Sequence, residues 1–92
     1  MAFDVVIRRG TVVDGTGAPP MKADIGISGE RITTVGDIPA SASESAKTID
    51  ATGLHISPGF IDVHSHADAA LLNDGQHASG IRQGVTTEII SP

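Results

Sequence analysis

The C-terminal part of the chain predicts a strand, a helix and a second strand in that order, and this order restricts the possible folds. An apolar run at residues 60–63 follows a Pro-Gly breaker, and a β-branched run occupies residues 85–90. Between them, residues 67–72 and 78–83 are short helical candidates. Two strands joined through a helix pair in parallel, and parallel sheets are buried on both faces. A single unit of this kind cannot cover its own sheet, so the pattern predicts an α/β fold that is larger than residues 58–92.

Residues 1–57 show a different residue pattern, in which short β-branched runs are separated by turn signals. Alternation over residues 23–28 and 31–36, on either side of Gly29-Glu30, predicts a hairpin. The Ala- and Ser-rich residues 38–47 predict a surface loop with at most a short helical turn. The other expected strands are residues 3–7, 11–14, 48–51 and 54–57. We therefore expect residues 1–57 to form a separate β-rich lobe without a catalytic group.

Composition limits both the core and the partners. The chain has two phenylalanines and no tryptophan, tyrosine or cysteine. If its 92 residues stood alone, their hydrophobic core would be small and no disulfide would stabilise it. The net charge is −5 and the six Lys and Arg residues are scattered, which excludes a basic patch for nucleic acid. No apolar run approaches the ~20 residues of a membrane helix. The N-terminal run is too short for a signal-peptide core, so a cytoplasmic protein is expected.

His64-Ser65-His66 follows the strand at residues 60–63 and is the candidate metal site. Side chains two apart on a strand point to the same face, so the two imidazoles converge above the strand end. Parallel-sheet proteins place their active sites at this edge, and zinc binds neutral imidazole well. Alternatively, both are ordinary loop histidines, as an isolated His-x-His usually is. Two polar rings after a buried strand are costly unless they are ligated or hydrogen-bonded, which favours the metal site.

Two carboxylates near the pair are candidates for supporting roles on the metal or substrate side. Asp62 lies two residues before His64, on the same face of a regular strand, where it could orient a ligand. Bonds to backbone N–H groups or to a basic residue explain Asp62 equally well. Asp68 could hydrogen-bond a metal-bound histidine, face the substrate, or cap the next helical turn. No residue of the chain is assigned as a catalytic acid, base or nucleophile.

The stretch Pro58-Gly59-Phe60-Ile61-Asp62-Val63-His64-Ser65-His66 resembles the first barrel strand of the amidohydrolase superfamily. Residues 5–17, 24–32, 49–53 and 84–87 are similar to other strands of these enzymes, so the likeness covers essentially the whole chain. Within the superfamily, the stretches most similar to the N-acyl-D-amino-acid deacylase (D-aminoacylase) group are residues 15–17, 64–68 and 82–88.

The resemblance implies a metal-dependent (β/α)₈ barrel hydrolase. Residues 58–92 would be its first βαβ unit, and residues 1–57 would be strands of a small composite β-sandwich. It also implies one or two zinc ions, held by His64 and His66 and by ligands on the remaining C-terminal polypeptide, which would carry the proton-transfer aspartate too. The reaction would be hydrolysis of an amide C–N bond in a small molecule, an N-acyl-(D-)amino acid or a related amide. The 92-residue chain alone would be inactive, because a zinc enzyme needs three protein ligands and a water.

Two other functions remain open at this point. A dihydroorotase- or hydantoinase-like hydrolase of cyclic amides shares the broad pattern. A non-catalytic β-rich binding or assembly module would leave the His-Ser-His segment without a metal. Zinc content separates the module from the enzymes, and a homo-oligomer is compatible with all three.

Overall fold

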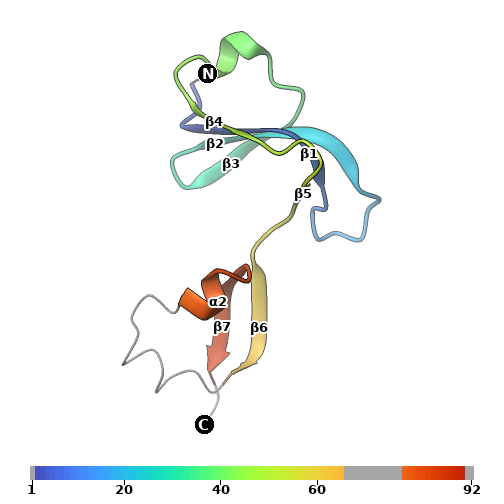
Figure 1. Cartoon of the computed structure of the whole chain (residues 1–92), viewed down its shortest axis with the longest axis vertical. Coiled ribbons are helices and arrows are strands. Elements are labelled where there is room, and N and C mark those ends of the chain that lie inside the picture. Colours follow the sequence, from blue (N-terminus) through green and yellow to red (C-terminus); the bar gives the residue numbers. More distant parts are fainter. Residues whose placement is uncertain (1, 66–77, 91–92) are drawn as a thin grey trace. The chain divides into compact units, whose positions relative to one another are not determined.

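The computed structural model describes residues 2–65 and 78–90, and the chain divides into two compact units, Met1–Pro58 and Gly59–Pro92. The first unit contains a five-stranded sheet and the second a two-stranded sheet (Figure 1). The residues of the first unit therefore form a strand-rich small domain. No helix in these two described ranges is long and apolar enough to cross a membrane.

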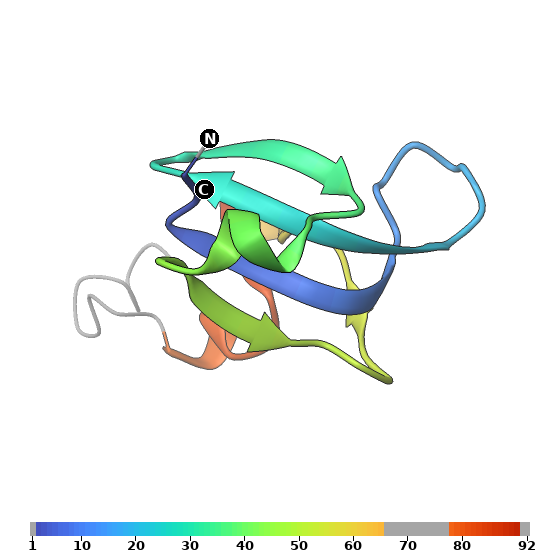
Figure 2. The ribbon, with the colours of Figure 1, turned by 90° about the horizontal axis from the view of Figure 1, so that it is seen from above.

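The first unit is arranged around β1 (Val5–Val12), which pairs with three other strands. One edge of β1 pairs antiparallel with β2 (Met21–Ser28), which in turn pairs antiparallel with β3 (Arg31–Gly36). The other edge pairs in parallel with β4 (Lys47–Asp50) and then with β5 (His55–Ile56). The sheet order β3-β2-β1-β4 can be followed in Figure 2. The antiparallel pairing of β2 and β3 confirms the predicted hairpin.

The sequence predicted two strands at residues 3–7 and 11–14, but the structure joins them into the single strand β1 with a bulge. Arg8 and Arg9 together lie opposite Asp24, since Ile7 pairs with Ile25 and the next pair is Gly10 with Ala23. The Arg9 N–H donates to the Asp24 carboxylate at 2.9 Å, and Arg9 adopts the left-handed φ of +60°. The Asp24 carboxylate on β2 therefore accepts the backbone N–H that the bulge leaves without a strand partner, so β1 continues through the bulge.

The core of the first unit is small, as the composition predicted. One cluster consists of Phe3, Val6 and Ile38, and another consists of Val12, Ala23 and Ile25. Among the described residues, Val6 is the largest side chain that is fully buried. A short 3₁₀ helix, η1 (Ala40–Ser43), follows Ile38, and Ala42 packs against the first cluster. This helix is the short turn predicted within residues 38–47.

The left-handed backbone of Arg9 gives a test of the bulge. A non-glycine residue at positive φ costs roughly 1–2 kcal/mol. Arg9→Gly and Arg9→Ala both remove the guanidinium, but only glycine relieves the backbone. We expect Arg9→Gly to be more stable than Arg9→Ala by about 1 kcal/mol in urea unfolding followed by circular dichroism. Equal stabilities of the two variants would show that the left-handed conformation of residue 9 carries no strain.

The second unit contains β6 (Phe60–Ser65), α2 (Ala78–Ile81) and β7 (Val85–Ile90). β6 and β7 pair in parallel, which confirms the predicted strand–helix–strand order (Figure 1). The helical candidate at residues 67–72 lies outside the described residues. Several apolar side chains of this unit are more than half exposed, namely Phe60, Ile61, Val63, Ile81 and Ile89. In the first unit Ile32 and Leu54 are likewise more than half exposed, whereas the two apolar clusters are buried.

Candidate metal centre

β6, the strand that carries His64, is hydrogen-bonded from its first residue to the turn that precedes β7. The Phe60 N–H donates to the Gly84 carbonyl at 2.8 Å, which joins the start of β6 to the turn before β7. Because the two strands are parallel, their carboxyl ends lie at the same edge of the sheet. His64 is the penultimate residue of β6, so its backbone lies at the edge where parallel-sheet proteins place their active sites.

The pairing of β6 with β7 contains two irregularities, and His64 lies in one of them. The paired residues are Phe60 with Val85, Ile61 with Thr87, Asp62 with Glu88, and Ser65 with Ile90. Thr86 is therefore an extra residue of β7, whereas Val63 and His64 together lie opposite Ile89. The two offsets run in opposite directions and cancel, so the strands end in the register in which they began. Bulges re-aim side chains and are frequent next to active sites.

The structure locates the predicted site residues only in part. His64 and Asp62 lie in β6, and Asp62 is half-buried beside its register partner Glu88. His66 and Asp68 lie outside the described residues, so their positions relative to His64 remain predictions. In the part of the chain that the structure describes, no three His, Cys, Asp or Glu side chains come together as a metal site.

The donor types of this segment fit a divalent metal of borderline softness. The chain supplies two histidines two positions apart, and the first lies at the carboxyl end of a parallel strand. Imidazole suits zinc, and a catalytic zinc needs three protein ligands and one open position. The two histidines would therefore be a partial ligand set that other residues complete.

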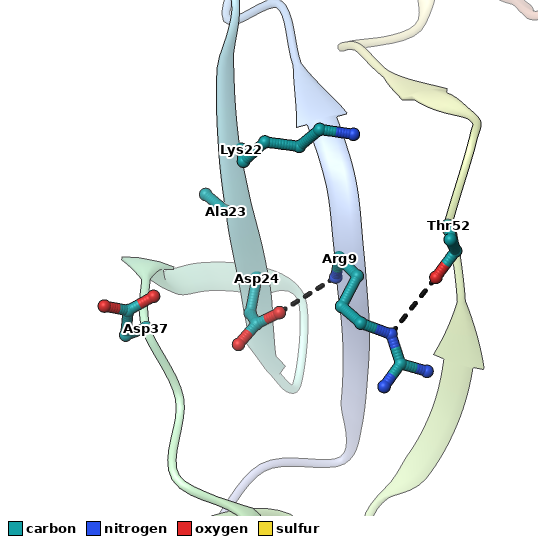
Figure 3. Close-up of a pocket in the computed structure, with 6 residues that line it drawn as sticks. All are labelled: Arg9, Lys22, Ala23, Asp24, Asp37 and Thr52. Atoms are coloured by element: carbon teal, nitrogen blue, oxygen red, sulfur yellow. Dashed lines mark hydrogen bonds between the residues drawn. The ribbon is translucent and has the colours of Figure 1, made fainter.

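A second polar site lies in the first unit and was missed by the sequence reasoning. It is an open pocket of about 400 Å³ lined by Arg9, Lys22, Ala23, Asp24, Asp37 and Thr52 (Figure 3). The Arg9 side chain reaches from the bulge toward Thr52, donating to its hydroxyl oxygen at 3.1 Å, and forms an ion pair with Asp50 at 3.1 Å. The linear sequence gives no signal for this pocket, because Arg9, Asp24 and Thr52 come from three separate segments.

Two carboxylates in or beside this pocket, those of Asp24 and Asp50, are compensated by neighbouring donors. Burial raises the pKa of Asp24, but N–H bonds from Arg9 and Ile38 and the charges of Arg8 and Arg9 outweigh burial, so the pKa is lowered overall. The Thr52 hydroxyl and N–H, together with Arg9, lower the pKa of Asp50 to about 2. Asp24 accepts the Arg9 N–H at the bulge and so stabilises it. Both carboxylates stay ionised at neutral pH, so neither is poised for proton transfer there.

Comparison with known proteins finds similarity along almost the whole chain. Residues 47–91 match the amidohydrolase family. A D-aminoacylase from Alcaligenes xylosoxydans xylosoxydans is 40% identical over 87 residues, covering 95% of this chain and 18% of that protein. Adenine deaminase 2 from Agrobacterium fabrum (strain C58 / ATCC 33970) is 41% identical over 91 residues, covering 98% of this chain and 15% of that protein.

Solved structures agree with the sequence relatives. A D-aminoacylase studied for its binuclear metal centre superposes with a TM-score of 0.87 at 46% identity, covering 96% of this chain and 18% of that chain. An N-acyl-D-glutamate deacylase from Bordetella bronchiseptica, complexed with zinc and a phosphonate inhibitor, superposes with a TM-score of 0.88 at 36% identity. That superposition covers 98% of this chain and 19% of the deacylase. The chain thus spans less than a fifth of the length of each of these relatives.

Proposed function

We propose that this chain, which is a relative of the amidohydrolases, forms the N-terminal part of a metal-dependent hydrolase of amide C–N bonds. The substrate would be an N-acyl-(D-)amino acid. In the complete protein, residues 58–92 would be the first βαβ unit of a (β/α)₈ barrel, and residues 1–57 would contribute strands to a small β-sandwich. The remaining C-terminal polypeptide would supply the other strands of both.

The observation that supports this proposal most is the agreement between structure and motif. The chain superposes over 96% of its length on a D-aminoacylase studied for its binuclear metal centre. The parallel strand β6 carries His64 of the His-Ser-His segment to the carboxyl edge of its sheet. A loop histidine pair in a binding module would need neither a parallel partner strand nor this position.

In this proposal His64 and His66 hold one or two zinc ions. A bound zinc ion supplies Lewis-acid activation of the scissile carbonyl and of a water molecule. His64 and His66 act by fixing the position of the ion through neutral imidazole nitrogens. Asp62 and Asp68 would orient those imidazoles or face the substrate through hydrogen bonds. The proton-transfer group and the remaining ligands would come from outside this chain.

A second candidate reaction is favoured by one comparison. Adenine deaminase 2 is 41% identical to this chain, so deamination of a nucleobase by the same kind of metal site is a specific alternative. Both reactions use water to break a bond between carbon and nitrogen. They differ in the leaving group, which is an amino acid in one case and ammonia in the other.

The proposal is tested with the complete protein loaded with zinc. We expect release of free amino acid from N-acetyl-D-amino acids, measured by amine derivatisation, with slower release from the L-enantiomers. Adenine, a hydantoin and dihydroorotate serve as competing substrates in parallel assays. Ammonia from adenine without amino acid release would favour the deaminase alternative, and ring opening of the cyclic amides would favour the hydantoinase-like one. A complete protein that retains no zinc after loading and hydrolyses none of these substrates would support the non-catalytic module.

A further inference from the structure

Two glycines in the second unit each lie against a side chain of the opposite strand. A Cβ atom at Gly59 would overlap the Thr86 side chain and come within 2.7 Å of the Thr86 Cβ. A Cβ atom at Gly84 would come within 3.1 Å of the Phe60 ring. The beginnings of β6 and β7 therefore fit together at close range, and only a residue without a side chain fits at Gly59.

The two glycines are required for different reasons. Gly84 has a φ of +87°, a left-handed conformation that side chains disfavour in any surroundings. Gly59 is not among the residues with positive φ, so its backbone is open to any residue and its requirement is steric alone. A smaller partner at position 86 should therefore relieve a larger residue at position 59, which makes the contact testable by paired substitution.

The side chain that lies against Gly59 belongs to Thr86, which is the extra residue of β7. Thr86 has no register partner in β6, and its side chain fills the space that Gly59 leaves open. The bulge at Thr86 shifts β7 by one residue relative to β6. β6 then has an extra residue of its own, because Val63 and His64 lie together opposite Ile89, and this second offset cancels the first. The bulge that contains His64 is thus the counterpart of the bulge that Gly59 accommodates.

We propose that Gly59 is a positioning residue for the metal centre. By accommodating Thr86, it holds the one-residue offset that β6 compensates at His64, and so it sets where His64 lies at the sheet edge. This inference rests on the proposed function, because it takes His64 as a metal ligand. The sequence identified Pro58-Gly59 only as a breaker before the strand, whereas the contact with Thr86 gives Gly59 a second role.

The test compares Gly59→Ala with Gly59→Ala/Thr86→Gly in the complete protein. We expect Gly59→Ala to weaken zinc binding at least about 10-fold in a chelator competition, and to change the visible absorption spectrum of the cobalt-substituted protein. Thr86→Gly removes the overlap, so the double variant should regain the zinc affinity and the cobalt spectrum. The matched control is Gly59→Ala/Thr87→Gly, which shortens the neighbouring threonine and should restore neither.

The outcomes separate the inference from the function on which it rests. Gly59→Ala that folds, binds zinc with unchanged affinity and keeps its cobalt spectrum would overturn the positioning role. If Gly59→Ala does not fold, the double variant decides, because failure of that variant to fold and bind zinc would overturn the steric argument. Absence of zinc binding by the unsubstituted protein would instead overturn the proposed function, and the inference with it.

Discussion

Alanine at His64 or at His66 is expected to abolish zinc retention by the complete protein. Each histidine is proposed to be a direct ligand, and even outer partners of metal ligands typically cost 10–100-fold in affinity when removed. We therefore expect each substitution to weaken zinc binding by more than about 100-fold, and hydrolysis to fall with the metal content. Metal content by atomic emission after dialysis, together with the rate of amide hydrolysis, measures both effects.

His55→Ala is the matched control for these two variants. His55 lies in β5 of the first unit, where its side chain is exposed. Its removal should leave the zinc content and the hydrolysis rate unchanged. Full zinc retention by both the His64 and His66 variants would show that this segment does not form the metal centre. Loss of zinc in all three variants would indicate a general unfolding effect.

Asp24→Ala is expected to destabilise the first unit strongly. The Asp24 carboxylate accepts hydrogen bonds from the Arg9 N–H, from the Ile38 N–H at 3.1 Å and from the Arg8 guanidinium at 3.2 Å. The Arg8 and Asp24 side chains are only 16% and 14% exposed. Truncation leaves the Arg9 and Ile38 N–H groups without this acceptor. The Arg8 guanidinium keeps its bond to the Ile38 carbonyl but loses its charged partner. Together these losses should cost about 2–4 kcal/mol of unfolding free energy in a urea titration.

Acid should remove the same contribution, because the pKa of Asp24 is lowered in the folded protein. A carboxyl group of this kind stabilises the fold above its unfolded pKa of about 3.9, and its contribution is lost as the pH falls through the lower folded pKa. The stability difference between the unsubstituted chain and Asp24→Ala should therefore be constant near neutrality and shrink below about pH 4. Asp37→Ala, which removes an exposed carboxylate of the same pocket, should change stability little at any pH. A similar loss in both variants would contradict the role given to Asp24.

Local patterns predicted most of the secondary structure. Alternation around Gly29-Glu30 predicted the β2–β3 hairpin, and a helical candidate between two apolar runs predicted the parallel pairing of β6 and β7. The hairpin depends on residues that are close in sequence. The parallel pairing depends on the helical connection between two consecutive strands. The sparse aromatic content likewise predicted the small core of the first unit.

The bulges could not be predicted in the same way, because distant residues determine them. The continuity of β1 through Arg9 depends on Asp24, which belongs to the next strand of the sheet. The irregular register of β6 depends on Thr86 filling the space above Gly59. The spacing of His64 and His66 suggested a metal pair on a regular strand, whereas the structure places a bulge at His64. The pair itself remains a prediction, since His66 lies outside the described residues.

The pairing of β1 with two late segments also bears on how the chain is made. β1 and the β2–β3 hairpin are close in sequence and can associate early during synthesis. The other edge of β1 meets Lys47–Asp50 and then His55–Ile56, so it stays unpaired until those residues have left the ribosome. Pairings distant in sequence form slowly, and an open strand edge can capture another chain. A nascent chain from which these residues have not yet emerged therefore presents one edge of β1 without its pairing strands.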